Sequence, residues 1–281
     1  MAKGVLIADS GSTKTEWCVV RTDGTKEQRH TAGINPVYQS REEIVRLIRE
    51  ELPEFLRQAG SVRFYGAGCA FPEKNRQVAE ALEACFGTAD IEIHSDLAGA
   101  ARALCGRGPG IACILGTGSN SCYYDGERIV QNIPPLGFIL GDEGSGAYIG
   151  KRLLADALKG LLPADLTERL LKEIALSYPE IIDRVYRQPL PNRFLAGSTR
   201  FAAACIARPE IRQIVQEALD AFIRRNVLLY PQARELPVSF TGSVAWVFRE
   251  LLQETLETHS LQAGHFSPAP MEGLLRYHCL L

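Results

Sequence analysis

Short apolar runs that end in glycine-rich turns occur twice along the chain. The first run, residues 4–9, is followed by a polar turn, a second apolar run at 17–20 and the dipeptide Asp23-Gly24, which favours tight hairpin turns. The same order of apolar run, glycine loop, apolar run and hairpin dipeptide returns between residues 111 and 130. Because the two segments share this order, we expect two structurally related halves.

Apolar residues at helical spacing lie between the two strand units. Residues 41–59 follow the spacing i, i+3, i+4, i+7, and Ser40 with Glu43 forms a capping box at their start. Pro53 should kink or divide this helix, because proline removes an N–H donor from the helix interior. Strands that alternate with helices in the rest of the chain indicate an α/β protein with layered sheets. The remaining predicted elements are strands at 62–65, 91–94 and 238–240, helices at 75–86, 97–104, 244–257 and 271–277, and a largely helical stretch from 145 to about 229 with loops at 189–198.

The composition is that of an ordinary globular protein without a strong net charge. Of the 281 residues, 31 are Lys or Arg and 33 are Asp or Glu, which gives a formal charge of −2. Such a chain has no general electrostatic affinity for nucleic acid or anionic lipid, so any bound anion must be held by local geometry. At this length one large domain or two smaller ones are typical, and the repeated unit favours two.

The cysteines and the apolar runs indicate a reducing compartment. The eight cysteines are scattered through apolar segments without a Cys-x-x-Cys pair, and we interpret them as small buried side chains. No stretch approaches the ~18 to 20 apolar residues of a membrane helix. The first apolar run is too short for the hydrophobic region of a signal peptide. We therefore expect a cytoplasmic protein that binds neither membrane nor nucleic acid.

Three loops combine glycine with hydroxyl side chains. Neither of the first two is a Walker loop, since each joins a strand to a strand, and either one alone is compatible with a plain hairpin connection. Together, their free backbone N–H groups and hydroxyls predict phosphate binding without net charge. The third lies between a strand and a helix, where the helix dipole favours an anion or a ribose hydroxyl. The loops are Gly11-Ser12-Thr13-Lys14, Gly116-Thr117-Gly118-Ser119 and Thr241-Gly242-Ser243.

Acidic residues at strand ends are candidates for the chemistry. Asp9 leads into the first loop and is either a turn carboxylate that caps local N–H groups or a carboxylate that faces the Mg²⁺ of a nucleotide through water. Asp96 is either the N-cap of the following helix or a general base that accepts a proton from a hydroxyl attacking phosphorus. The segment 141–146, with two acids among glycines, either initiates a helix or binds sugar hydroxyls. The five histidines show no metal-ligand spacing.

The order of these segments resembles that of the actin-like ATPase and sugar kinase superfamily. More narrowly, the chain resembles the branch that contains the N-acetylglucosamine kinases and the BadF/BadG-type ATPases, which activate certain acyl-CoA dehydratases and reductases. The resemblance extends from residue 4 to about residue 275. The segments that carry it are Asp9-Ser10-Gly11-Ser12-Thr13-Lys14-Thr15, Leu115-Gly116-Thr117-Gly118-Ser119-Asn120, Gly141-Asp142-Glu143-Gly144-Ser145 and Thr241-Gly242-Ser243.

The resemblance implies two ribonuclease-H-like domains with mixed sheets that close on a central cleft, with ATP and Mg²⁺ as cofactors. Residues 1–107 would form the N-terminal domain, with the first phosphate loop, the sugar side and the catalytic base. Residues 108–281 would form the C-terminal domain, with a helical insertion, the second phosphate loop and the adenosine loop. The last helix is a candidate to return to the N-terminal domain.

The same resemblance implies a role for each candidate residue. Asp96 would be the catalytic base, and Asp9 would face the metal. The phosphate-binding residues would be Gly11, Ser12, Thr13, Lys14, Gly116, Thr117, Gly118 and Ser119, and the adenosine-binding residues Gly242 and Ser243. The sugar-binding residues would be Asn35, Asp96, Thr117, Gly137 and Asp142.

The expected activity is ATP-dependent phosphorylation of the primary hydroxyl of an amino sugar, most simply N-acetylglucosamine to its 6-phosphate. Three positions depart from the family. Ser10 replaces the usual glycine of the first loop, while Val37 and Phe138 stand where the animal N-acetylglucosamine kinases have tryptophan and histidine. The last two changes fall on the sugar side, so N-acetylglucosamine, glucosamine and N-acetylmuramate all stay open as substrates.

Two other classes of function stay open. One is an ATPase that drives electron transfer into a dehydratase and holds an iron–sulfur cluster at its dimer interface, although the cysteines show no obvious cluster arrangement. The other is a protein that binds nucleotide and sugar without phosphotransfer, which Asp96 disfavours. The helical stretch 145–229 is longer than one core requires, which favours a homodimer.

Overall fold

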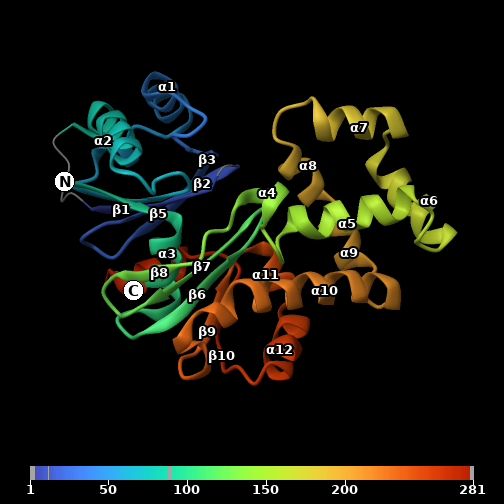
Figure 1. Ribbon diagram of the computed structural model, residues 1–281. Helices are drawn as coiled ribbons and strands as arrows, with labels where there is room; N and C mark the ends of the chain where they lie inside the picture. Colours follow the sequence, from blue (N-terminus) through green and yellow to red (C-terminus); the bar gives the residue numbers. More distant parts are fainter. Residues whose placement is uncertain (1–3, 12, 88–89, 279–281) are drawn as a thin grey trace. The chain divides into compact units, whose positions relative to one another are not determined.

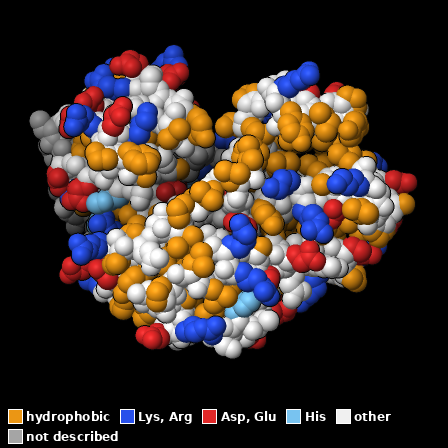
Figure 2. Space-filling view, in the orientation of Figure 1, with side chains coloured by type: hydrophobic (Ala, Val, Ile, Leu, Met, Phe, Trp, Pro, Cys, Tyr) orange, Lys and Arg blue, Asp and Glu red, His pale blue; other side chains and the backbone are white. Residues whose placement is uncertain are grey.

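The computed structural model describes residues 4–11, 13–87 and 90–278. The chain forms two compact units (Figure 1). Unit 1 comprises residues 1–107 and 270–281, and unit 2 comprises residues 108–269. On the face shown in Figure 2, basic and acidic side chains are interspersed over both units.

Unit 1 is built on a five-stranded sheet of order β3-β2-β1-β4-β5. Strand β2 runs antiparallel to β1 and β3 runs antiparallel to β2, whereas β4 and β5 run parallel to β1. One face packs on α1 and α2 through a core that includes Trp17 and Phe64, and the other packs on α3 and α13 through Ile7 and Tyr65. The elements are β1 (Val5–Ser10), β2 (Lys14–Val20), β3 (Lys26–Ala32), α1 (Arg41–Glu51), the 3₁₀ turn Leu56–Gln58, β4 (Ser61–Gly66), α2 (Pro72–Phe86), β5 (Asp90–Ser95), α3 (Asp96–Cys105) and α13 (Met271–Tyr277).

Unit 2 repeats this sheet. Its strand order is β10-β9-β6-β7-β8. On one side of the central strand β6, β7 runs antiparallel to β6 and β8 runs antiparallel to β7, and on the other side β9 and β10 run parallel to β6. The prediction of two related halves in an α/β protein is therefore confirmed. The strands are β6 (Gly110–Leu115), β7 (Ser119–Tyr124), β8 (Ile129–Asn132), β9 (Val238–Thr241) and β10 (Ala263–Ser267). The helices are α4 (Gly137–Leu140), α5 (Gly146–Leu158), α6 (Ala164–Ile174), α7 (Tyr178–Tyr186), α8 (Pro191–Gly197), α9 (Thr199–Ala204), α10 (Pro209–Arg225), α11 (Ser243–Val247) and α12 (Arg249–Thr258), with 3₁₀ turns at Val227–Leu229 and Pro231–Arg234.

Three details of the sequence-based expectation change. Pro53 divides the helix predicted for 41–59, because α1 ends at Glu51 and only a 3₁₀ turn follows. The loop predicted for 189–198 is wrong: α8 occupies most of it and packs so closely on α5 that a Cβ on Gly150 would lie 1.8 Å from the Leu195 carbonyl oxygen. The single helix predicted for 244–257 is also wrong, since it breaks at Phe248 into α11 and α12.

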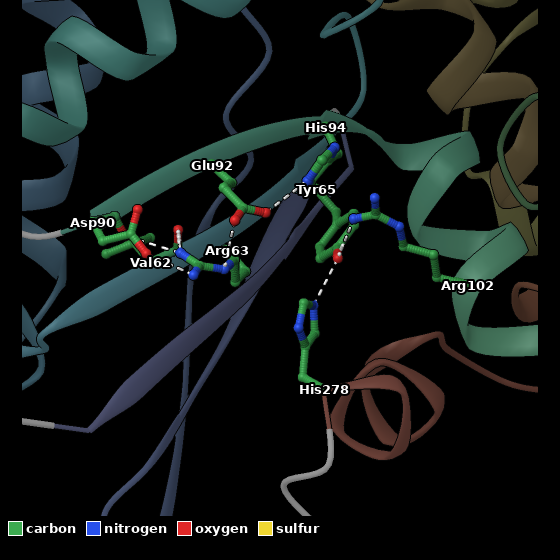
Figure 3. A network of polar contacts seen from close by, with 8 residues as sticks. All are labelled: Val62, Arg63, Tyr65, Asp90, Glu92, His94, Arg102 and His278. Carbon is green, nitrogen blue, oxygen red and sulfur yellow. Dashed lines mark hydrogen bonds and ion pairs between the residues drawn. The ribbon is translucent and has the colours of Figure 1, made fainter. Parts of the chain in front are cut away.

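Helix α13 belongs to unit 1 although it follows unit 2 in the chain. Gly273 allows the close approach to α3, because a Cβ there would lie 2.3 Å from the Ala103 carbonyl oxygen. A polar network on the same side of the sheet joins Tyr65 of β4, Arg102 of α3 and His278 at the end of α13 (Figure 3). No helix among the described residues is long and apolar enough to cross a membrane.

Candidate active site

The acids predicted to carry the chemistry lie at one edge of the unit 1 sheet. Asp9 is near the carboxyl end of β1, and Asp96 directly follows β5. Because β1, β4 and β5 are parallel, their carboxyl ends meet at the same edge, where open α/β sheets bind their ligands. Glu16 of β2 stands directly opposite Asp9 in the antiparallel pair. Three carboxylates therefore gather here.

Asp9 is held where its negative charge is unfavourable. Burial raises the pKa of its carboxyl group to about 7, and the neighbouring charges of Asp96 and Glu16 add to this effect. Lys14 lowers the pKa but does not compensate. Nearby cations stabilise a carboxylate of this kind, so Asp9 is suited to face a positively charged ligand.

Asp96 does not cap the helix that follows it. The N-cap is Ser95, whose hydroxyl accepts a hydrogen bond from the amide of Ala98 at 3.1 Å. Asp96 is the first helical residue, and its Oδ1 accepts from the amide of Leu97 at 2.8 Å. The structure gives Oδ2 no hydrogen-bond partner among the described residues. Burial raises the pKa of this carboxyl group, so one oxygen of a fixed and more basic carboxylate remains available.

The first glycine loop is a tight connection from β1 to β2. The amide of Gly11 donates to the Lys14 carbonyl at 3.0 Å, and the Thr13 carbonyl accepts from the amide of Gly33 at 3.1 Å. Ser12, which was also expected to bind phosphate, lies outside the described residues. The second of these contacts ties the loop to the segment that carries Asn35.

Asn35 is buried in a turn that follows β3. Its side-chain Oδ1 accepts a hydrogen bond from the backbone amide of Val37 at 3.0 Å, and its backbone amide donates to Gln39 Oε1 at 2.7 Å. Gly68, at φ +80°, makes room for this side chain, because a Cβ there would lie 2.3 Å from Asn35 Oδ1. The turn is thus rigidly built around Asn35, and Val37 beside it is about half exposed.

The second glycine loop, in unit 2, rests on the first turn of α5. The amides of Gly146 and Ala147 donate to the carbonyls of Gly116 and Thr117 at 2.8 and 3.1 Å. In a trans peptide the N–H points opposite to the C=O, so the amides of Thr117 and Gly118 point away from the helix. Neither amide has a hydrogen-bond partner among the described residues. Two neighbouring N–H groups without a described partner are suited to bind phosphate oxygens.

Asp142 packs against this loop from the segment before α5. Its Oδ1 accepts from the amide of Ser119 at 3.2 Å, and a Cβ on Gly118 would lie 3.1 Å from its Oδ2. Burial raises the pKa of the carboxyl group, and the charge of Glu143 adds to the effect. Asp142 has the unusual φ of +53°. Its backbone amide donates a hydrogen bond to the Pro135 carbonyl at 2.9 Å, which closes the bend.

The other residues of this segment differ in their roles. Glu143 is buried and forms an ion pair with Arg225, so its charge is already compensated. Gly137 begins α4 at φ +73° and is exposed. Phe138 is half-buried against the small core formed by Ala147, Leu154 and Leu195.

The third loop lies beside the second. Gly242 has a φ of +113°, and a Cβ there would lie 2.4 Å from the Leu115 carbonyl oxygen at the start of the Gly116 loop. Gly242 therefore has to be glycine for two reasons, its backbone conformation and this close approach. Ser243 follows as the first residue of α11.

Comparison with known sequences assigns the chain to a protein family. Its residues 8–164 match the sequence pattern of the BadF/BadG/BcrA/BcrD ATPase family. The chain belongs to this family. Among proteins with curated functions, no sequence match was found.

Several solved structures are similar to the chain. A protein from Porphyromonas gingivalis is 47% identical over 98% of both chains, and its structure matches with a TM-score of 0.93. A protein from Chromobacterium violaceum is 21% identical over 100% of this chain and 99% of its own, with a TM-score of 0.74. Both are described as "Putative N-acetylglucosamine Kinase". A ROK family glucokinase from Streptomyces griseus, 13% identical over 98% of both chains, has a TM-score of 0.59. The last two likenesses concern the fold alone.

The acidic edge of unit 1 fits the way in which Mg²⁺ binds beside a nucleotide. Among the described residues no group of three His, Cys, Asp or Glu side chains could hold a metal ion by itself. Mg²⁺ in nucleotide sites instead keeps several waters and takes one or two carboxylates together with phosphate oxygens. Asp9, with its raised pKa, would be the carboxylate that gains most from such an ion.

The roles of two residues of unit 1, one at the acidic edge and one on the opposite face of the sheet, were missed from the sequence. Glu16 could have been found from the hairpin register, because pairing β1 with β2 sets it opposite Asp9. Ser10 was noted only as a departure from glycine. Its buried contacts depend on a segment 24 positions away, which no local pattern reveals.

Proposed function

We propose that this ATPase-family protein is a sugar kinase that transfers the γ-phosphoryl group of ATP to the primary hydroxyl of an amino sugar, most simply N-acetylglucosamine. The observation that carries the proposal is Asp96. It is a carboxylate of raised pKa that is fixed by one hydrogen bond and keeps one oxygen without a described partner, at the sheet edge that also bears Asp9 and the first glycine loop.

In the proposed reaction Asp96 accepts the proton of the sugar hydroxyl. Oδ1 is engaged by the Leu97 amide, so Oδ2 would take the proton as the hydroxyl oxygen attacks phosphorus. A raised pKa suits this role, because it brings the basicity of the carboxylate closer to the working pH.

The phosphates would be bound by neutral groups. The amides of Thr117 and Gly118 offer N–H donors without adding net charge. The family resemblance implies that the loop at Gly11–Lys14 also contacts phosphate. Asp9 would hold Mg²⁺, which would neutralise charge on the phosphates. Asn35 and Asp142 are proposed to bind the sugar hydroxyls or its N-acyl group, as the family resemblance implies.

An iron–sulfur ATPase is less consistent with the thiols described. Burial raises the pKa of Cys69 to about 12 and that of Cys105 to about 11, so iron would have to displace the proton of either thiol against this shift. Cys279 lies outside the described residues.

The test is release of ADP with a panel of amino sugars, plain hexoses and N-acetylmuramate, repeated with Asp96→Asn. Asparagine keeps an acceptor for the Leu97 amide but cannot take the proton, so we expect kcat to fall by about 10² to 10⁴-fold with little change in ATP affinity. Ser95→Ala is the matched control, because it weakens the same helix start by about 1 kcal/mol and keeps the carboxylate. Near-normal sugar-dependent ADP release by Asp96→Asn would disprove the role of Asp96, and no ADP release with any sugar would disprove the proposed function.

A further inference from the structure

Ser10 is a buried polar residue between the first glycine loop and the segment that carries Asn35. It ends β1 and is fully buried. Successive side chains of a strand alternate between faces, so Ser10 lies on the α1/α2 face with Leu6 and Ala8, while Asp9 lies on the opposite face with Ile7. Ser10 therefore does not belong to the acidic edge, and its buried hydroxyl needs another explanation.

The Ser10 hydroxyl contacts both backbone polar groups of Ile34. Its Oγ lies 3.0 Å from the Ile34 amide nitrogen, which donates to it, and 3.0 Å from the Ile34 carbonyl oxygen. Among the described residues neither of these Ile34 groups has another partner. Because Ile34 is fully buried, both groups would otherwise be left without a hydrogen bond at considerable cost.

A second hydroxyl completes the network. Thr15 Oγ1 lies 2.7 Å from Ser10 Oγ and 3.2 Å from the Ala32 carbonyl oxygen. Ser10 can donate to the Ile34 carbonyl while Thr15 donates to Ser10, or Ser10 can donate to Thr15 while Thr15 donates to the Ala32 carbonyl. In either arrangement the Ile34 amide donates to Ser10, so this contact is constant.

The contact lies one residue before Asn35 and one residue before Gly11. We infer that Ser10 is a positioning residue that fixes Asn35 for the sugar by clamping Ile34 to the end of β1, an inference that rests on the proposed sugar kinase function. The parallel contact from the Gly33 amide to the Thr13 carbonyl remains when Ser10 is changed, so the loss of Ser10 should displace the Asn35 turn without detaching it.

The experiment compares steady-state kinetics of the wild type, Ser10→Ala, Asn35→Ala and the double variant. We expect Ser10→Ala to raise the KM for the sugar about tenfold, the effect of losing one buried hydrogen-bonded pair, while the KM for ATP changes less than about twofold. Because Ser10 acts through Asn35, the double variant should resemble Asn35→Ala. Ser10→Cys, whose thiol is a weak acceptor for the Ile34 amide and a weak donor, should lie between Ser10→Ala and the wild type.

Tyr65→Phe is the stability control, because its hydroxyl lies in the network on the opposite face of the same sheet; it should leave both KM values unchanged. The inference would be overturned by equal changes in the two KM values, by no change in either KM, or by additive effects in the double variant. Absence of sugar-dependent turnover in the wild type would instead disprove the proposed function. Hydrogen exchange then tests the clamp by itself, since Ser10→Ala should lose protection at 33–39, and unchanged protection there would overturn the inference.

Discussion

Acid should loosen the attachment of α13 to the unit 1 sheet. Arg102 Nη1 donates to the Tyr65 hydroxyl oxygen at 2.9 Å, so the hydroxyl hydrogen is directed to His278 Nε2 at 2.8 Å (Figure 3). This arrangement requires a neutral His278. Burial and the nearby charges of Arg102 and Arg63 lower the pKa of His278 to about 4, and Glu92 opposes them only in part. A proton on His278 would therefore place a second cation against an oxygen that already faces Arg102.

The magnitude follows from the two pKa values. The unfolded chain takes up the proton below about pH 6.5 and the folded chain only below about pH 4, so the stability of the fold declines as the pH falls through this interval. At 1.36 kcal/mol per pH unit the full interval corresponds to about 3.4 kcal/mol. Because the side chain is only partly buried, solvent screening reduces this to about 1 to 2 kcal/mol.

The assay is hydrogen exchange of the amides of α13 at pH 7 and pH 5, corrected for the intrinsic exchange rates. We expect protection in the wild type to fall about tenfold at pH 5, and His278→Gln to abolish most of this dependence because glutamine does not titrate. His94 stacks on Tyr65, and burial also lowers its pKa, so His94→Gln combined with His278→Gln should remove the remainder. His30→Gln, at an exposed position on β3, is the control. If His278→Gln showed the same pH dependence as the wild type, the reasoning would be refuted.

Two further predictions concern unit 2. Gly242→Ala should weaken nucleotide binding at least tenfold, because its Cβ would lie 2.4 Å from the Leu115 carbonyl oxygen; isothermal titration should detect this, and Gly197→Ala, whose Cβ meets nothing within 4 Å, should bind normally. Tyr230→Phe should lower the free energy of unfolding by about 1 to 3 kcal/mol, since the buried hydroxyl bonds Ser121 Oγ at 2.8 Å and accepts from the Ile133 amide at 2.9 Å. Denaturant unfolding with an unchanged midpoint would contradict this estimate.

Much of the fold could be predicted because its signals are local. The capping box at Ser40 and Glu43 and the final helix at Met271–Tyr277 appear as predicted. The loop predicted for 189–198 failed because packing on Gly150 stabilises a short helix that begins with Pro191, a contact the segment itself does not encode. Strand β10 was missed because Ala263–Ser267 lacks clear alternation and gains its pairing only from β9.

Some features of the candidate site could likewise be predicted from the sequence, and others could not. The sequence by itself determined the three glycine loops, the acids at strand ends and the repeated strand-loop-strand unit, because short segments with fixed backbone requirements carry these features. Only the tertiary structure decided that Ser95 rather than Asp96 caps α3, that burial and the charges of Asp96 and Glu16 raise the pKa of Asp9, and that the Ser10 hydroxyl satisfies the backbone of Ile34. Such contacts arise from strand register and from the shared edge of parallel strands, which bring together residues far apart in the chain.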